Sequence, residues 1–189
     1  MRAALELWTD RGFENGIEST TVEEIVRVAG VTKGTFYFHF ARKEEILFEM
    51  GWETGAVVNE EARRCVKAQR GLEDSLARLI ATLTTRIRAA PPAGVARSIS
   101  EFQRRPRTDW GASDRAGFDL GFELVFAQAQ KDGELSMDIP ASEMARILVA
   151  LAMDAIVDYT ASHSDLRASL NRRAAIVVGG LKIPAAISS

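Results

Sequence analysis

The segment from Thr21 to Phe40 constrains the fold more than any other part of the chain, because it contains two short helix patterns on either side of Gly30. Thr21 and Glu24 have the spacing of a capping box, so a helix is predicted to begin at the next residue, Val22. The apolar residues that follow have the i, i+3, i+4, i+7 spacing of one buried helix face: Val22, Ile25, Val26 and Ala29. Gly30 is predicted to end this helix, because glycine readily adopts the positive φ found just after a helix.

A second short helix is predicted after Gly30, with Thr32 as its N-cap. Phe36 and Phe40 lie four residues apart and are expected to face inward together. The outward set then includes Lys33, Thr35, Tyr37 and His39. Two short helices joined by a glycine turn form a helix-turn-helix, whose second helix enters the major groove of DNA. The pattern therefore predicts a DNA-binding protein.

Three stretches in this order resemble the tetracycline-repressor-like (TetR) family of bacterial regulators: TVEEI (21–25), AGVTKGTFYFHF (29–40) and KEEIL (43–47). The family motif to which they belong covers about a quarter of the chain. The resemblance implies an all-α protein with a three-helix helix-turn-helix domain over residues 1–45. A larger helical effector-binding and dimerisation domain would follow over residues 46–189. It further implies a ligand-responsive transcriptional repressor that binds an inverted-repeat operator in double-stranded DNA as a homodimer.

The chain departs from the family pattern in its first 42 residues. Its first helix, which ends near Gly12, begins later than usual, and residues 14–19 form a longer link to the capped helix. Arg42 stands where the family commonly has a residue that caps the next helix, which an arginine side chain cannot do.

Helical spacing continues to the end of the chain, and no strand pattern is found. About nine helices are expected in all. Those after the DNA-binding segment run from Lys43 towards Gln69, from Leu72 to Ile87, through Ile99 and Phe102, and over residues 114–131, 141–162 and 166–181.

The helix over residues 141–162 is apolar nearly all round, and with the helix over 166–181 it has more apolar surface than one small core hides. A second copy of the chain is expected to cover the excess, in a two-fold dimer built around a four-helix bundle. The predicted interface comprises Leu148, Ala152, Ala155, Ile156, Tyr159, Leu170, Ile176 and Val177.

The predicted DNA-binding residues gather on and around the second short helix: Thr21, Thr32, Lys33, Gly34, Thr35, Tyr37, His39 and Lys43. For Tyr37 the alternative is a place in the aromatic core, and for His39 it is a solvated ring. Phe38 either touches a thymine methyl group or packs inside the protein. Residues 1–50 hold six Lys and Arg against nine Asp and Glu, so only modest non-specific affinity for DNA is expected.

An apolar effector cavity is predicted in the second domain, with these lining residues: Phe102, Trp110, Phe118, Phe122, Met144 and Met153. The alternative is that phenylalanines at this helical spacing belong to the core. No cofactor, metal site or catalytic residue is expected, which disfavours a helical enzyme that merely contains the motif. Asp154 and Asp158 are expected to pair with an arginine. A regulator controlled by a protein partner stays open as a second possibility.

A cytoplasmic location is expected. Cys65 is the single cysteine, so no internal disulfide is possible. The first residues are amphipathic and include Glu6 and Asp10, unlike a signal peptide. The most apolar run, from Ile147 to Met153, is far shorter than the roughly twenty residues that span a membrane.

Overall fold

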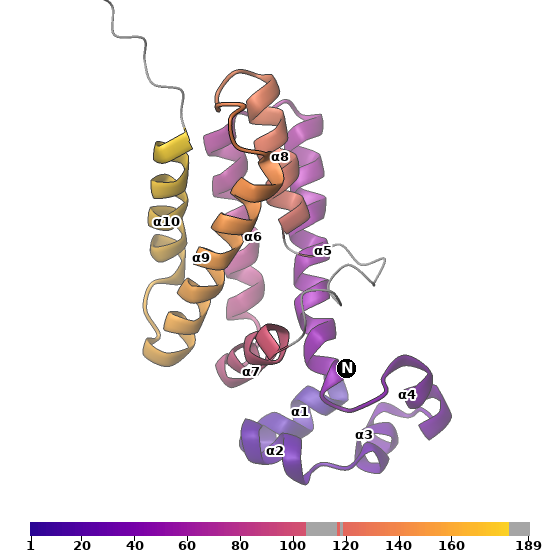
Figure 1. Ribbon diagram of the computed structural model, residues 1–189. Coiled ribbons are helices and arrows are strands. Elements are labelled where there is room, and N and C mark those ends of the chain that lie inside the picture. Colours follow the sequence, from indigo (N-terminus) through magenta and orange to yellow (C-terminus); the bar gives the residue numbers. More distant parts are fainter. Residues whose placement is uncertain (105–116, 118, 182–189) are drawn as a thin grey trace, which may run out of the picture.

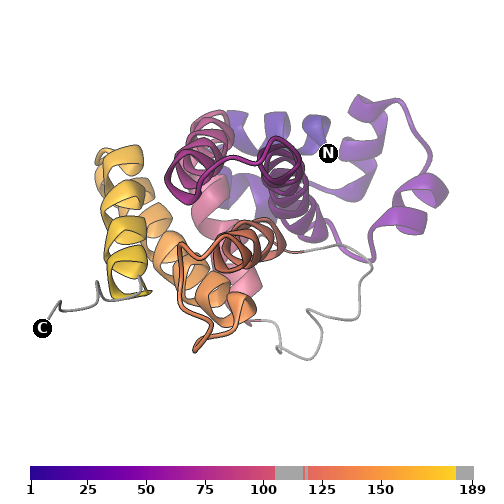
Figure 2. The same ribbon diagram turned by 90° about the horizontal axis from the view of Figure 1, so that it is seen from above.

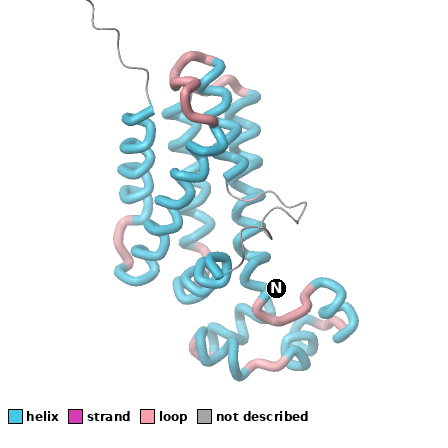
Figure 3. The backbone as a smooth tube through the Cα atoms, viewed as in Figure 1, coloured by secondary structure: helices cyan, strands magenta, loops and turns pink. Residues whose placement is uncertain are grey.

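The computed structural model describes residues 1–104, 117 and 119–181. These residues form ten α-helices and no strand, which confirms the all-α fold (Figures 1 and 3). The helices are α1 (Arg2–Asp10), α2 (Phe13–Ser19), α3 (Val22–Ala29), α4 (Lys33–His39), α5 (Glu45–Lys67), α6 (Leu72–Arg88), α7 (Pro92–Arg104), α8 (Asp119–Lys131), α9 (Ala141–Ser162) and α10 (Leu166–Leu181).

Helices α1 to α4 form a small N-terminal unit at the lower end of the molecule in Figure 1. Its core contains Trp8, Ile25 and Phe36, together with Ile46 and Leu47 from the first turn of α5. Helix α5 therefore belongs to this core at its start and continues into the larger helical part. The domain boundary at residue 45 stays a prediction.

Residues 14–19, which were expected to form a link, are helical. Gly12 has a φ of +73° and ends the chain reversal between α1 and α2. Helix α2 then packs closely against α1, since a Cβ atom added at Gly16 would lie only 2.4 Å from the carbonyl oxygen of Trp8. The N-terminal unit thus contains four helices rather than three.

The larger part consists of helices α5, α6, α8, α9 and α10, with α7 lying across the end that faces the N-terminal unit (Figures 1 and 2). Its core includes the fully buried side chains of Leu79, Phe126 and Met144. Helices α9 and α10 have the bounds that the sequence predicts. Across the described ranges, no helix is both long enough and apolar enough to cross a membrane.

Buried Asn59 joins α5 to the beginning of α8. Its Nδ2 donates a hydrogen bond to the carbonyl oxygen of Gly117 at 3.0 Å, and its Oδ1 accepts one from the amide of Gly121 at 2.7 Å. The helix predicted over residues 114–131 is described from Asp119, and most of its expected first turn lies outside the described residues. Asn59 thereby satisfies an amide in the first turn of α8 that has no partner within the helix.

Candidate nucleic-acid interface and ligand cavity

Helices α3 and α4 are held in a helix-turn-helix by the local interactions that the sequence predicts. The Thr21 hydroxyl accepts a hydrogen bond from the Glu24 amide at 3.2 Å, and the Thr21 amide donates to Glu24 Oε2 at 2.9 Å. Gly30 adopts the left-handed conformation with a φ of 69°. The Thr32 hydroxyl accepts a hydrogen bond from the Thr35 amide at 3.1 Å, so the capping box, the turn and the second cap are all confirmed.

Helix α4 has one buried face and one face open to solvent. Phe36 is buried and its ring centroid lies 5.4 Å from that of half-buried Phe40. The predicted DNA-binding residues of this segment are all exposed: Thr32, Lys33, Gly34, Thr35, Tyr37 and His39. Tyr37 and Phe38 are 54% and 84% exposed, so neither belongs to the aromatic core.

Lys33 and Glu23 form an ion pair that links α4 to α3. The hydrogen bond from Lys33 lowers the pKa of Glu23, and the same contact raises the pKa of Lys33. Both side chains are more than half exposed, so the pair lies at the surface of the helix-turn-helix. A DNA phosphate could therefore replace the Glu23 carboxylate as the partner of Lys33 without exposing a buried charge.

Lys43 lies before α5, which begins at Glu45, and not inside the first turn of that helix as expected. Its ammonium group donates hydrogen bonds to the carbonyl oxygens of Glu18 at 3.2 Å and Thr20 at 2.8 Å. These contacts place a positive charge at the C-terminal end of α2, where the helix dipole favours it. Lys43 thus has a structural partner, and its contact with DNA stays a prediction.

Arg11 completes the scaffold of the N-terminal unit, a role that the sequence did not reveal. Its guanidinium donates hydrogen bonds to Glu24 Oε1 at 2.7 Å and to the Thr20 hydroxyl at 3.2 Å. The hydrogen bond from Arg11, followed by that from the Thr21 amide, lowers the pKa of Glu24 to about 2. Because Arg11 lies in the turn after α1 and Glu24 lies in α3, 13 residues later, no local spacing pattern marks this pair.

A cavity of about 50 Å³ lies between α5, α6, α7 and α9. Two of the predicted ligand-binding residues, Phe102 and Met153, line it. Its other lining residues are Met50, Gly51, Thr54, Arg86, Ile87, Ala90, Val95, Ser98, Ile99 and Ile156. The wall is mostly apolar, as expected for a site that binds an apolar ligand.

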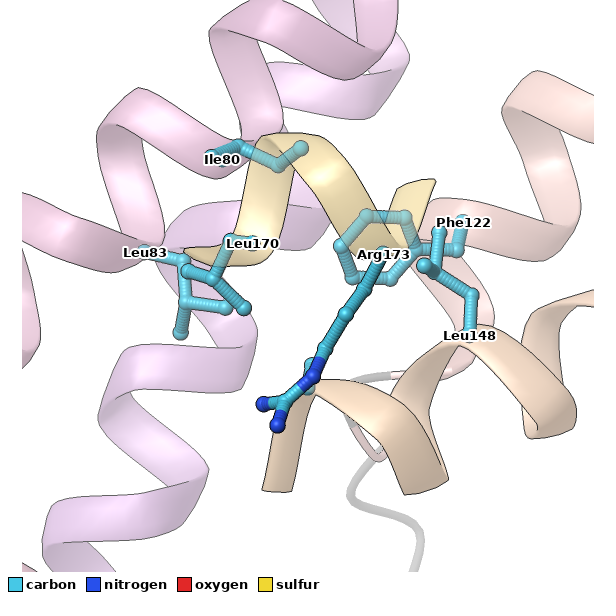
Figure 4. A pocket seen from close by; sticks show the side chains of 7 residues that line it. Ile80, Leu83, Phe122, Leu148, Leu170 and Arg173 are labelled. Atoms are coloured by element: carbon cyan, nitrogen blue, oxygen red, sulfur yellow. The ribbon is translucent and has the colours of Figure 1, made fainter. Parts of the chain in front are cut away.

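The structure does not bring Phe122 or Met144, which were also predicted to bind the ligand, to this cavity. Phe122 lines a separate cavity of about 10 Å³ together with Arg173 and five further side chains (Figure 4). Met144 is fully buried in the core, so for these two residues the core alternative describes their surroundings. Trp110 and Phe118 lie outside the described residues.

Three polar side chains line the 50 Å³ cavity. The hydroxyls of Ser98 and Thr54 donate to the carbonyl oxygens of Leu47 at 2.8 Å and Met50 at 2.9 Å. Arg86 differs, because its Nε is buried and has no hydrogen-bond partner among the described residues. Its Nη2 lies 3.6 Å from Glu53 Oε2. Arg86 is thus the lining residue with unused capacity to donate a hydrogen bond.

Helix α7 contacts both the cavity and the N-terminal unit. Its residues Val95, Ser98, Ile99 and Phe102 line the cavity. At Gly94 an added Cβ atom would lie 2.8 Å from the ring of Phe13 in α2, so the two helices approach closely. Arg97 Nη1 lies 3.4 Å from Glu14 Oε2, also in α2. A displacement of α7 would therefore also shift α2 in the N-terminal unit.

Most of the predicted dimer-interface residues lie inside the chain's own core. Leu148, Ala152, Ala155, Ile156, Leu170 and Val177 are buried, so they have almost no surface to offer to a second chain. Because the helix over residues 141–162 is apolar nearly all round, the sequence pattern could not indicate which of its sides faces the core. Ile176 is 72% exposed and Tyr159 is half-buried. The apolar surface that remains on α9 and α10 consists mainly of Ile147, Val157 and Ile176.

Asp154 and Asp158 share an arginine, as expected. Arg173 of α10 donates to Asp154 Oδ2 at 2.7 Å and to Asp158 Oδ2 at 3.0 Å, which joins α10 to α9. In the part of the chain that the structure describes, no group of three or more His, Cys, Asp or Glu side chains is placed to hold a metal ion.

Comparison with known proteins gives a family model and related structures. The model for "Bacterial regulatory proteins, tetR family" matches residues 1–50. FadR from Thermus thermophilus, a TetR-family transcriptional repressor solved in complex with lauroyl-CoA, is 25% identical; the match covers 100% of this chain and 96% of FadR, with a TM-score of 0.75. No curated protein sequence gives a significant match.

Two further structures share the fold at lower identity. The fatty acid degradation regulator FadR from Bacillus halodurans is 17% identical, with 95% of this chain and 93% of that chain covered and a TM-score of 0.66. SmeT, the repressor of the Stenotrophomonas maltophilia multidrug efflux pump SmeDEF, is 18% identical, with 97% and 90% covered and a TM-score of 0.59.

Proposed function

We propose that this chain, which belongs to the tetR family of bacterial regulatory proteins, is a transcriptional repressor that a small-molecule effector releases from an inverted-repeat DNA operator. The observation that carries the DNA-binding role is the exposed outer face of α4, with its polar residues in the second helix of a helix-turn-helix. We propose that eight residues contact DNA directly: Thr21, Thr32, Lys33, Gly34, Thr35, Tyr37, His39 and Lys43.

The experiment that tests this function is selection of duplexes from a random DNA pool by the full chain. We expect an inverted repeat to be enriched.

Lys33→Gln should weaken binding to the selected duplex and make the slope of log K against log salt shallower by about two for a dimer, since each lost phosphate contact removes about 0.9 from the slope. The slope is measured by fluorescence anisotropy over a series of salt concentrations. Lys67→Gln is the matched control, because it removes the same charge from an exposed site at the end of α5. Equal slopes in the two variants would contradict a phosphate contact by Lys33.

The effector is proposed to bind in the cavity between α5, α6, α7 and α9. At about 50 Å³ the cavity has room for only a few water molecules, so a larger effector requires α7 to move outwards. Because α7 also packs on α2 through Gly94 and Arg97, that movement would shift the N-terminal unit. An effector that binds only the displaced arrangement would thereby lower affinity for the operator, through its different affinities for the two states.

The lining favours an effector with an apolar part and an acidic group. Apolar side chains form most of the wall, and Arg86 has a buried Nε without a partner among the described residues. An acidic group could accept a charge-assisted hydrogen bond from the Arg86 Nε. The related FadR complex with lauroyl-CoA makes an acyl series, as free acids and as coenzyme A thioesters, the first set of probes.

Met153→Trp should abolish effector binding, because the larger side chain fills the cavity from α9. For the wild type, a compound at a hundred times its Kd should stabilise the fold by about 2.7 kcal/mol. Thermal shift and operator binding are measured for both proteins. Met137→Trp is the control, since Met137 is exposed outside the helices. Equal stabilisation of the wild type and Met153→Trp would place the effector elsewhere.

The protein is proposed to form a homodimer whose interface lies on the outer sides of α9 and α10, around Ile147, Val157 and Ile176. Two-fold symmetry would space two copies of α4 for two half-sites of one operator. We place the protein in the cytoplasm, where bacterial DNA is found, and assign it no catalytic activity.

A further inference from the structure

Phe38 is the most exposed large apolar side chain of the described residues, at 84%, and it lies in α4, near the C-terminal end of that helix. A phenylalanine ring that stays in water does not contribute the favourable free energy that its burial would provide. Helix α4 lies at the outer edge of the N-terminal unit, away from α9 and α10, in both Figures 1 and 2. The ring therefore faces neither the chain's own core nor the proposed dimer face.

The position of Phe38 on α4 makes it the centre of the solvent-facing side. It follows the buried Phe36 by two residues, which is about 200° around a helix of 3.6 residues per turn. Gly34, one turn earlier, lies on the same face, and open space surrounds it apart from the Thr32 hydroxyl. The middle of the outer face therefore offers a bare backbone followed by an aromatic ring, with the His39 ring packed edge-to-face against it at a centroid distance of 5.0 Å.

The polar residues beside this strip are partly engaged within the protein. Lys33 is paired with Glu23, and the Thr35 hydroxyl lies 3.0 Å from the Thr32 hydroxyl. An apolar side chain in the major groove has one specific base feature to contact, the C5-methyl group of thymine. Cytosine, adenine and guanine have no methyl group at that edge.

We propose that Phe38 determines sequence specificity by packing its ring on a thymine methyl group in each half-site. This inference rests on the proposed DNA-binding function and adds the base that the centre of α4 reads. Burial of one methyl group corresponds to about a fourfold change in affinity, so two half-sites together would change it about fifteenfold.

The test uses the full-length protein and the duplex that the wild type enriches. Each thymine is replaced by deoxyuridine, symmetrically in both half-sites, which removes the methyl group and keeps the base pair. We expect at least one replacement to weaken wild-type binding about fifteenfold. Phe38→Ala should bind the thymine and deoxyuridine duplexes equally. Met137→Ala is the control, because it removes an apolar side chain at another exposed site. It should bind the thymine duplex more tightly than the deoxyuridine duplex, as the wild type does.

Two outcomes would overturn this inference alone: no deoxyuridine replacement weakens wild-type binding, or Phe38→Ala still discriminates against deoxyuridine. Thermal denaturation of Phe38→Ala, which we expect to match the wild type because the ring is exposed, separates lost recognition from lost folding. A wild-type chain that enriches no DNA sequence would overturn the proposed function, and this inference with it.

Discussion

Ile176→Glu is expected to produce a monomer that binds the operator at least about a hundredfold more weakly than the wild type, since two linked half-site contacts gain a factor of 10² to 10⁴ over one. Ile176 is 72% exposed on α10, which packs beside α9 with its exposed Ile147 and Val157. In a two-fold interface the substitution places two carboxylates in the seam, and each costs several kcal/mol to desolvate without a partner.

Sedimentation at micromolar protein concentration and operator titration measure the two effects. Met137→Glu is the matched control, because it adds the same charge to an apolar residue that is 73% exposed but lies outside α9 and α10. The control should remain a dimer with unchanged operator affinity. An Ile176→Glu protein that stays dimeric would show that this face of α10 is not the seam.

Gly16→Ala is expected to destabilise the N-terminal unit by at least about 2 kcal/mol, within the range for overpacked sites. Inside a helix the same change ordinarily stabilises by up to about 1 kcal/mol, so the sign of the effect is informative. The added Cβ atom would lie 2.4 Å from the Trp8 carbonyl oxygen and 2.6 Å from its Cα. Both are backbone atoms, and only a separation of α1 from α2 relieves the clash.

Chemical denaturation should show that the N-terminal unit unfolds at a lower denaturant concentration than the larger helical part. Operator binding should be weakened in the same variant. Gly71→Ala provides the comparison. Its Cβ atom would meet only the Glu134 carboxylate, at 3.9 Å, so we expect a change below about 1 kcal/mol for a glycine N-cap. Gly16→Ala with wild-type stability would mean that α1 and α2 do not pack as described.

The helix-turn-helix was predictable because its determinants are local. The Thr21 and Glu24 capping box, the left-handed Gly30 and the Thr32 cap each involve residues within a few positions of one another. The spacing of Phe36 and Phe40 likewise fixes which side of α4 turns inward. Such interactions form within a few residues of the chain and need no distant partner, so the sequence alone determined where α3 and α4 begin, where α3 ends and which face of α4 is outward.

Tertiary packing decided the features that depend on residues far apart in the chain. Lys43 binds carbonyl groups 23 and 25 residues away, and Arg11 reaches Glu24 on another helix. A cavity exists where side chains from several helices fail to fill space, so periodicity could not separate Phe102 from Phe122.

The orientation of α9 shows the same limit most clearly. Its bounds followed from Pro140 and the apolar run, but a helix that is apolar nearly all round has no sequence signal for which side turns inward. The three-dimensional fit against α8 and α10 buries Leu148 and Ala155 and leaves Ile147 and Val157 in solvent. Local sequence determined which segments are helical and how the DNA-reading helix is presented, whereas complementarity between distant surfaces decided what each helix buries and what it leaves for a partner.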